Sequence, residues 1–295
     1  MSRTAFKLAA AQFPVFAPAS WDEVEALVSE WVAIAVAEGA SLLVFPEYGS
    51  MSLAHLDAAT RSDLHGQIAA MQVYRDPWLA LHRRLAQAHC VYILAGSFPW
   101  QLADGRYVNR AWFCAPNGGI EHQDKCVMTR FEREQWNISG EPPLKVFDTA
   151  LGKIAVNICY DSEFPLLARA QAEAGAQIIL VPSCTDTLAG YYRVRVGAQA
   201  RALENQCYVV QSPIVGEAPW SPAVDVNIGA AGIYGPPDRG FPDDGVLQQG
   251  PINELCWIYA IVDPAKVAQV RSDGAVFPFR HWPESAGRTI EIITL

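Results

Sequence analysis

Apolar residues in the first third of the chain are grouped in a pattern that alternates between strand and helix. Three apolar runs are typical of buried strands: FKLAAAQF at 6–13, SLLVFPE at 41–47 and VYILAGSF at 91–98. Between the first two, Ser20 is followed three residues later by Glu23, the spacing of a capping box, which predicts a helix start. Asp76 and Pro77 predict a second helix start, because proline is favoured in the first turn. The order strand, helix, strand, helix, strand favours an α/β fold.

The middle of the chain changes to a pattern that predicts antiparallel pairs. Asn117-Gly118-Gly119 separates two apolar segments, at 107–116 and 120–128, and is a hairpin signal. A second pair, LKVFDT and KIAVNICY, is joined by residues 150–152. The later elements are a helix at 164–175, a strand at 176–183, a helix at 191–206, strands at 207–213 and 255–263, and a helix at 264–270. No repeat or long linker interrupts the series, so we expect one domain over residues 1–295 with mixed sheets.

The composition limits the classes of function. The chain is 51% hydrophobic and 18% charged, which is typical of a globular protein with a large core. Its net charge is -9 without any block of lysine or arginine, which argues against nucleic-acid partners and anionic membranes. No apolar run reaches the roughly 18 residues that span a bilayer, and residues 1–20 do not resemble a signal peptide. These features predict a cytoplasmic protein.

The distribution of cysteine and histidine predicts neither a disulfide framework nor a metal site. The seven cysteines are scattered and contain no CxxC pair, so we expect free thiols in a reducing compartment. The six histidines form neither an HxH nor an HExxH spacing. No metal is therefore expected.

Three polar residues, Glu47, Lys125 and Cys159, stand where predicted strands end, which is where ligands collect in α/β sheets. A helix predicted after Cys159 would favour a thiolate and lower its pKa. A partly desolvated Glu47 could act as general base and then acid, and Lys125 could stabilise an oxyanion. Each residue alone also fits a plainer interpretation: a buried thiol, a surface acid at a loop, and a solvated lysine.

Taken together and in this order, these residues resemble the nitrilase superfamily of carbon-nitrogen hydrolases. The resemblance rests on FPE at 45–47, DKCVMTRFEREQW at 124–136, NICYDSEFP at 157–165 and ARALENQCYVV at 200–210, with support from AAAQFPV, VPSCTD and DDGVLQQG. It implies a four-layer αββα sandwich, a cysteine that needs no histidine, no cofactor, and association into a homodimer or larger homo-oligomer through a face near the active site. In this family a Glu, a Lys and a Cys occur in that order, commonly with a second Glu after the Lys.

Carried over position by position, the resemblance implies that Cys159 is the nucleophile, Lys125 the residue that holds the oxyanion and Glu47 the general base. The second glutamate is Glu132 or Glu134, and the Glu-x-Trp pattern with Trp136 favours Glu134. The backbone N–H of Tyr160 is a second expected oxyanion donor.

Trp136 and Cys184 are expected at the substrate side of the site, Cys184 as a small packing residue. Arg193, Arg195 and Arg201 could pair with a substrate carboxylate, although structural ion pairs explain them equally simply.

The sequence around the nucleophile bears on the reaction. Nitrilases of the superfamily usually carry Cys-Trp-Glu, whereas amidases, ω-amidases and carbamoylases often carry Cys-Tyr-Asp, as Cys159, Tyr160 and Asp161 do here. The resemblance therefore implies hydrolysis of a small-molecule amide through a thioester. The alternatives are nitrile hydrolysis, a non-catalytic binding or scaffold protein with the same fold, and a hydrolase in which a histidine activates the cysteine.

Overall fold

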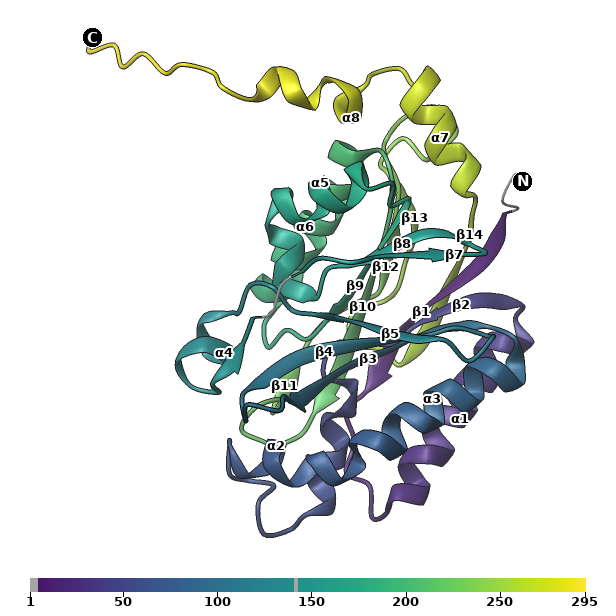
Figure 1. Ribbon diagram of the computed structural model, residues 1–295, viewed down its shortest axis with the longest axis vertical. Helices are drawn as coiled ribbons and strands as arrows, with labels where there is room; N and C mark the ends of the chain where they lie inside the picture. The colour runs from purple at the N-terminus through teal and green to yellow at the C-terminus, as the bar shows by residue number, and fades with distance from the viewer. Residues whose placement is uncertain (1–4, 141–142) are drawn as a thin grey trace.

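A computed structural model describes residues 5–140 and 143–295 of the chain (Figure 1). Residues 1–4, which belong to the predicted domain and to the segment considered for a signal peptide, lie outside the described residues. The strands are β1 (Phe6–Pro14), β2 (Ala40–Val44), β3 (Tyr92–Gln101), β4 (Tyr107–Cys114), β5 (Ile120–Asp124), β6 (Ile138–Ser139), β7 (Val146–Thr149), β8 (Gly152–Val156), β9 (Ile178–Ser183), β10 (Tyr208–Glu217), β11 (Val226–Asn227), β12 (Gly232–Tyr234), β13 (Val246–Gln249) and β14 (Cys256–Val262). The α-helices are α1 (Trp21–Ala37), α2 (Gly66–Ala70), α3 (Arg75–His89), α4 (Arg130–Glu134), α5 (Pro165–Glu173), α6 (Leu188–Asn205), α7 (Pro264–Asp273) and α8 (Pro278–His281), and the 3-10 helices are η1 (Gly49–Leu56), η2 (Met71–Tyr74), η3 (Cys159–Glu163) and η4 (Trp282–Ser285).

The strands form two mixed sheets. The first has the order β14-β1-β2-β3-β4-β5, in which β1, β2 and β3 are parallel and the flanking strands antiparallel. The second has the order β7-β8-β9-β10-β12-β13, in which β8, β9 and β10 are parallel. The ends of β1 and β10 meet, with Phe13 opposite Ile214. The hairpins predicted around residues 117–119 and 150–152 are both present.

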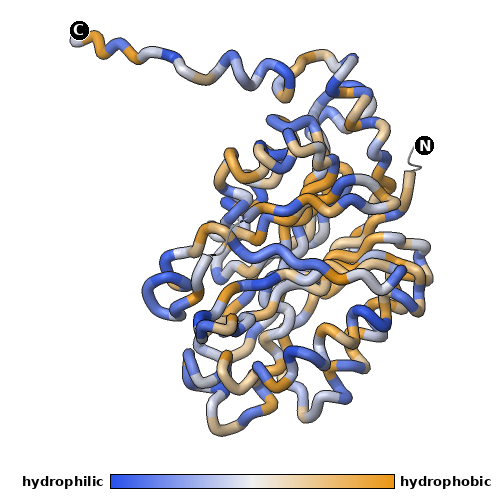
Figure 2. Tube along the Cα trace, in the orientation of Figure 1, coloured by the Kyte–Doolittle hydropathy of each residue, from blue (hydrophilic) through white to orange (hydrophobic). Residues whose placement is uncertain are grey.

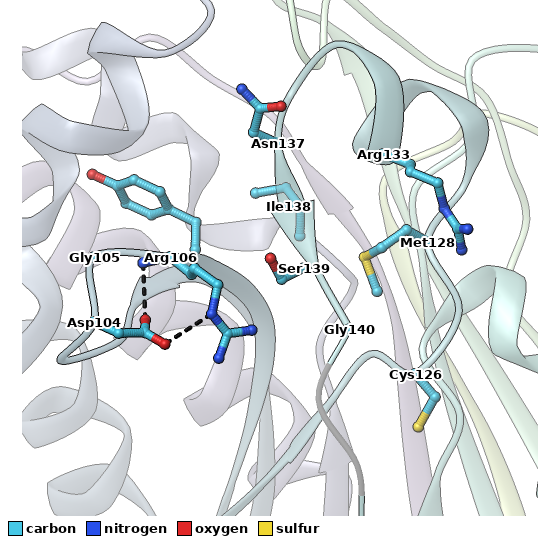
Figure 3. A pocket seen from close by; sticks show the side chains of 11 residues that line it. Asp104, Gly105, Arg106, Cys126, Met128, Arg133, Asn137, Ile138, Ser139 and Gly140 are labelled. Carbon is cyan, nitrogen blue, oxygen red and sulfur yellow. Dashed lines mark hydrogen bonds and ion pairs between the residues drawn. The ribbon is translucent and has the colours of Figure 1, made fainter.

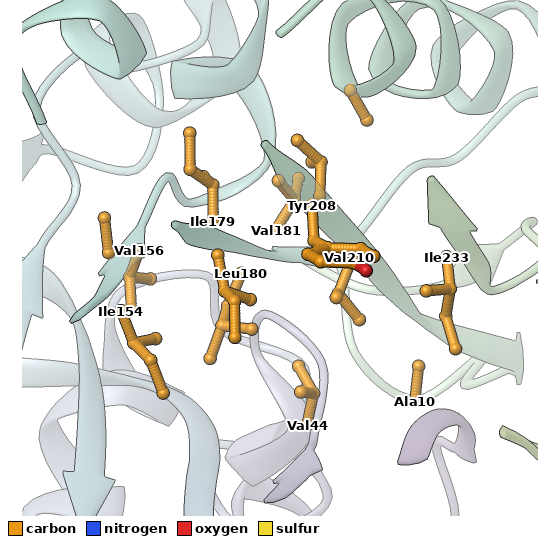
Figure 4. Packing of buried hydrophobic residues seen from close by; sticks show 14 of the residues in the cluster. Ala10, Val44, Ile154, Val156, Ile179, Leu180, Val181, Tyr208, Val210 and Ile233 are labelled. Carbon is orange, nitrogen blue, oxygen red and sulfur yellow. The ribbon is translucent and has the colours of Figure 1, made fainter. Parts of the chain in front are cut away.

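The alternation of side chains along β1 shows how the layers pack. Leu8 and Ala10 belong to the apolar cluster that includes strands of the second sheet, whereas Ala9 and Ala11 pack with the buried face of α1. Figure 4 shows Ala10 and Val44 beside side chains of the second sheet. Helices α1 and α3 cover the outside of the first sheet, and α5 and α6 cover the outside of the second (Figure 1). The predicted αββα sandwich is therefore confirmed.

The distribution of hydropathy agrees with these layers. Figure 2 shows apolar residues concentrated along the strands of the interior, while the turns of the outer helices carry hydrophilic residues. None of the helices within residues 5–140 and 143–295 combines the length and the apolar composition needed to cross a membrane.

The local start signals of the helices decide where several of them begin. Ser20 accepts a hydrogen bond from the backbone N–H of Glu23, as the capping box predicted, and α1 begins at Trp21. Helix α6 begins at Leu188 rather than Tyr191, because the side chain of Thr187 caps it.

A glycine in β3 allows the segment after β2 to approach that strand closely. Gly96 has a φ of +72°, and a Cβ there would lie 2.1 Å from the carbonyl oxygen of Pro46. In the same region the hydroxyl of Ser97 accepts a hydrogen bond from the backbone N–H of Tyr48 at 2.8 Å. These contacts hold the residues on both sides of Glu47 against the first sheet.

Candidate active site

Lys125 is the centre of a buried cluster of charges. Its ammonium lies 2.7 Å from an oxygen of Glu47 and 2.9 and 2.7 Å from the two oxygens of Glu132. All three side chains are shielded from solvent. They come from different parts of the chain, since Glu47 follows β2, Lys125 directly follows β5 and Glu132 lies in α4. Buried charges are stable only when they are paired and hydrogen-bonded, as they are here.

The structure places Glu132, and not Glu134, beside the lysine. Thr129 and Glu132 form a capping box at the start of α4, in which Glu132 accepts hydrogen bonds from the N–H and the hydroxyl of Thr129. This bends the carboxylate back toward Lys125. The side chain of Glu134 is 52% exposed and pairs with Arg130 at 2.7 Å, one turn away. The choice of Glu134 as second glutamate is therefore wrong. The spacing Thr-x-x-Glu at 129–132 is the sequence signal that identifies Glu132.

Two further side chains orient the carboxylates and were missed in the sequence. The amide of Asn109 donates to Glu47 at 2.8 Å and to Glu132 at 3.3 Å, and the hydroxyl of Tyr48 donates to Glu132 at 2.7 Å. Asn109 is buried in β4, but Arg110 beside it is polar as well, so the sequence carries no signal that singles out Asn109.

Cys159 reaches this cluster from the second sheet. It follows β8 and begins the short turn η3, so α5 starts only at Pro165 and the thiol is not in the first turn of that helix. Its φ is +48°, in the left-handed region that is uncommon for residues other than glycine and that is found at functional sites. The thiol is buried, lies 3.6 Å from the carbonyl oxygen of Cys184, and is close enough to Glu47 to hydrogen-bond to it.

Burial and the mutual charges shift the pKa values in this site. Burial, together with the charge of Glu132, raises the pKa of Glu47 to about 7 against the opposing charge of Lys125. Burial acts in the same direction on Glu132, but the charge and hydrogen bonds of Lys125 outweigh it and its pKa is lowered. Burial favours neutral Lys125, but the two glutamates raise its pKa well above the ordinary value. Lys125 is therefore charged.

The same effects correct the expectation of a thiolate. Burial and the charge of Glu47 raise the pKa of Cys159 well above its ordinary value, and Lys125 only partly opposes them. We therefore expect Cys159 to be a thiol, with the carboxylate of Glu47 beside it.

A cavity of about 350 Å³ opens onto the cluster. Trp136, Tyr160 and Cys184 are among the residues that line it. The remaining lining residues are Glu47, Tyr48, Lys125, Thr129, Arg130, Phe131, Glu132, Cys159, Glu163, Thr185, Asp186, Gly190, Arg193, Val194, Pro222, Ala223, Asp225 and Val226. Among the residues that the structure describes, no histidine lines this cavity. This arrangement gives no support to a cysteine–histidine pair.

The three arginines considered for substrate binding are not equivalent. Arg193 stands at the mouth of the cavity, where it pairs with Glu163 at 3.6 Å. Arg201 pairs with Glu204 and donates to the carbonyl oxygen of Ser162, so its role is structural. Arg195 is not among the lining residues.

A larger hollow of about 740 Å³ lies on the other side of the segment after Lys125 (Figure 3). Cys126 and Met128 are among the residues that line it, and Asp104 and Arg106 lie across from Met128. Lys125, Glu47 and Cys159 do not line it, so it is not the site of the clustered charges. No group of three or more potential metal ligands is arranged to hold an ion in the described part of the chain.

Comparisons with known proteins agree with the fold. The sequence model of the carbon-nitrogen hydrolase family matches residues 7–238. The probable hydrolase YhcX of Bacillus subtilis is 35% identical over 260 residues, which are 87% of this chain and 50% of that protein. A deaminated glutathione amidase of Synechocystis is 31% identical over 194 residues, covering 61% of this chain and 68% of that protein. The crystal structure of a carbon-nitrogen hydrolase from Helicobacter pylori superposes with a TM-score of 0.78 at 18% identity, covering 97% of this chain and 96% of that one.

The αββα sandwich and the family match point to the same class of protein. The chain belongs to the carbon-nitrogen hydrolase family. Its match with the Bacillus protein spans half of that protein's length.

Proposed function

We propose that the protein hydrolyses a small amide through a thioester on Cys159. One observation carries the proposal: a thiol, an ammonium and a carboxylate from two sheets converge at the floor of one shielded cavity. Nucleophilic catalysis needs a nucleophile with a base within reach and a donor for the developing oxyanion. Cys159, Glu47 and Lys125 supply these three groups.

The reaction follows from the protonation states. Glu47 takes the proton of the Cys159 thiol as sulfur attacks the amide carbon, and the oxyanion is held by Lys125 and the backbone N–H of Tyr160. Collapse breaks the carbon–nitrogen bond, and the proton on Glu47 passes to the leaving amine. Water, deprotonated by Glu47, then attacks the thioester. The carbon–sulfur bond breaks, the carboxylic acid leaves, and the proton on Glu47 returns to the sulfur of Cys159 as the free thiol.

Glu132 has a supporting role in this scheme. Its lowered pKa keeps it ionised, so it holds the charge of Lys125 throughout the cycle. Tyr48 and Asn109 fix its carboxylate. Because these groups are already oriented, little reorganisation is needed when the oxyanion forms.

The names of two relatives favour an amide substrate, and the volume of the cavity favours a small one. The relatives from Synechocystis and Xenopus laevis are named deaminated glutathione amidase and omega-amidase, and the latter is 30% identical over 128 residues. The cavity of about 350 Å³ is at the small end of the range for ligand sites, roughly 300–1,000 Å³. A small aliphatic amide, ω-amide or N-carbamoyl compound fits this description.

The test is an ammonia-release assay over ω-amides, aliphatic amides, N-carbamoyl amino acids and nitriles, with Cys159→Ala as the matched control. We expect turnover of at least one amide class, no turnover by the variant, and a thioester detected by intact mass in quenched wild-type samples. Turnover of nitriles alone would establish the nitrilase alternative. Amide turnover by Cys159→Ala would overturn the thioester mechanism.

A further inference from the structure

Asp161 is a buried carboxylate that is not in contact with the substrate cavity. It is 1% exposed and does not belong to the residues that line the cavity. Its oxygens accept hydrogen bonds from three backbone N–H groups: Cys126 at 3.1 and 3.2 Å, Val127 at 2.8 Å and Ile158 at 3.3 Å. An acid buried in this way is stabilised by hydrogen bonds from the main chain.

These donors belong to two segments that are distant in sequence. Cys126 and Val127 directly follow Lys125, which leaves the first sheet at the end of β5. Ile158 directly precedes Cys159, which leaves the second sheet after β8. One side chain thus joins the main chain next to the ammonium to the main chain next to the thiol, across the gap between the sheets.

The turn that holds Cys159 depends on the same residue. The backbone N–H of Asp161 donates to the carbonyl oxygen of Ile158 at 3.0 Å and closes the turn in which Cys159 has a positive φ. Its carboxylate accepts the N–H of Ile158 in return. The unusual backbone conformation of the nucleophile is therefore held from both sides by Asp161.

We infer that Asp161 is a positioning residue that sets the distance between the ammonium of Lys125 and the sulfur of Cys159. It acts through the main chain of both segments and does not touch the substrate. The expected effect of Asp161 on turnover rests on the proposed function. The positioning itself concerns only the side chains of Lys125 and Cys159 and can be tested without a substrate.

The test uses alkylation of Cys159 by iodoacetamide, which requires no knowledge of the substrate. The rate for each cysteine is measured by peptide mass spectrometry in the folded chain, and the exposed Cys90 serves as an internal reference. Asp161→Asn keeps the volume but replaces one acceptor oxygen by a donor. A displaced Lys125 stabilises the thiolate less, and one pKa unit corresponds to about tenfold in thiolate population. We expect Cys159 to react about tenfold more slowly, with the rate of Cys90 unchanged.

The opposite result identifies a different role. If Asp161 acted only through its negative charge, its removal would favour the thiolate and accelerate alkylation of Cys159. Faster or unchanged alkylation in a folded variant would therefore overturn the inference. Should Asp161→Asn not fold, Asp161→Ser is measured instead, because its hydroxyl cannot span both segments.

Asp124→Asn is the matched control. Asp124 is another buried carboxylate, immediately before Lys125, but it forms a two-point ion pair with Arg110 at 2.7 and 2.8 Å. Its loss lowers stability without removing the link to Cys159, so we expect Cys159 alkylation within about twofold of wild type. If both variants slow Cys159 equally, the effect is general loosening and the inference fails.

With an amide substrate in hand, Asp161→Asn should lower kcat by about 100-fold, because small misplacements of catalytic groups have effects of that size. KM should change little, since Asp161 does not line the cavity. An unchanged kcat alongside slowed alkylation would contradict the proposed mechanism and leave the positioning intact.

Discussion

The ammonium of Lys125 lies 2.7 Å from a carboxylate oxygen of Glu47, and both side chains are buried. This contact couples the protonation of Glu47 to the charge of Lys125, so the cluster titrates as a unit. A change in any one of Glu47, Lys125 and Glu132 should therefore alter the properties of the other two.

Lys125→Met should remove the oxyanion donor and lower kcat by about 100- to 1000-fold. It also leaves Glu47 and Glu132 buried without their cation, which should cost about 3–5 kcal/mol of unfolding free energy. Amide turnover and urea unfolding measure the two effects. Turnover close to wild type would exclude the proposed role of the lysine.

Glu132→Gln and Glu134→Gln form a matched pair two residues apart in α4. The first removes the charge that pairs with Lys125, and we expect a loss of activity on the order of 100-fold. The second removes an exposed pair with Arg130 and should leave activity within about twofold. Equal losses in the two variants would show that the structure assigns the wrong glutamate.

The pH profile should reflect Glu47. Its pKa is raised to about 7, and the ionised form is the base, so kcat/KM should rise about tenfold per unit of pH up to about 7 and then level off. In Glu47→Gln this rise should disappear together with most of the activity. A wild-type profile that is flat from about pH 5.5 to about pH 8 would contradict the assignment.

Glu47 should also make the free energy of unfolding depend on pH, but with the opposite sign: its contribution should fall as the pH rises. Because its pKa is raised on folding from an ordinary 4.5, the folded state binds this proton more tightly than the unfolded chain does. The contribution of Glu47 to stability is therefore complete below pH 4.5 and is lost as the pH rises to about 7. Glu47→Gln should be less sensitive to pH over this window in thermal unfolding.

A homo-oligomer is expected to form through α6. Leu188, Tyr192, Val196 and Leu203 lie exposed along this helix, whose residues Gly190, Arg193 and Val194 line the cavity. Val196→Glu should shift the protein toward monomers in light scattering, because a charge in an apolar contact is desolvated without a partner. Val73→Glu, which changes an equally exposed valine far from α6 in sequence, is the control. A monomeric wild-type protein at micromolar concentration would refute the expectation.

Most of the fold could be predicted because local signals and global packing agree in this chain. The apolar runs, the Ser20 cap and the Gly118 turn each specify their element without reference to distant residues. The start of α6 was misplaced, because the cap at Thr187 lies before the apolar pattern begins. The short helix η3 was not predicted, because the positive φ at Cys159 leaves no signal in that pattern. The strands β12 and β13 were not predicted, since they lie in a stretch rich in glycine and proline.

Part of the candidate site could be predicted from the residue types found at the ends of the predicted strands. Glu47, Lys125 and Cys159 meet because three strands end at one edge of the sandwich. The lowered pKa expected for Cys159 is wrong, since burial between the assembled layers raises it and the thiol does not lie in the first turn of α5. Asn109 is seen as part of the site only when its contacts are known.

Because Glu47 and Lys125 belong to the first sheet and Cys159 to the second, the site cannot form early in the synthesis of the chain. Glu47 and Lys125 emerge from the ribosome before Cys159, and the two sheets must close on each other before base and sulfur meet. A partly folded chain therefore carries an ordinary thiol with no base beside it, and the arrangement of thiol, carboxylate and ammonium forms only with the completed sandwich. Loss of activity should consequently be an early and sensitive sign that the two layers have begun to separate.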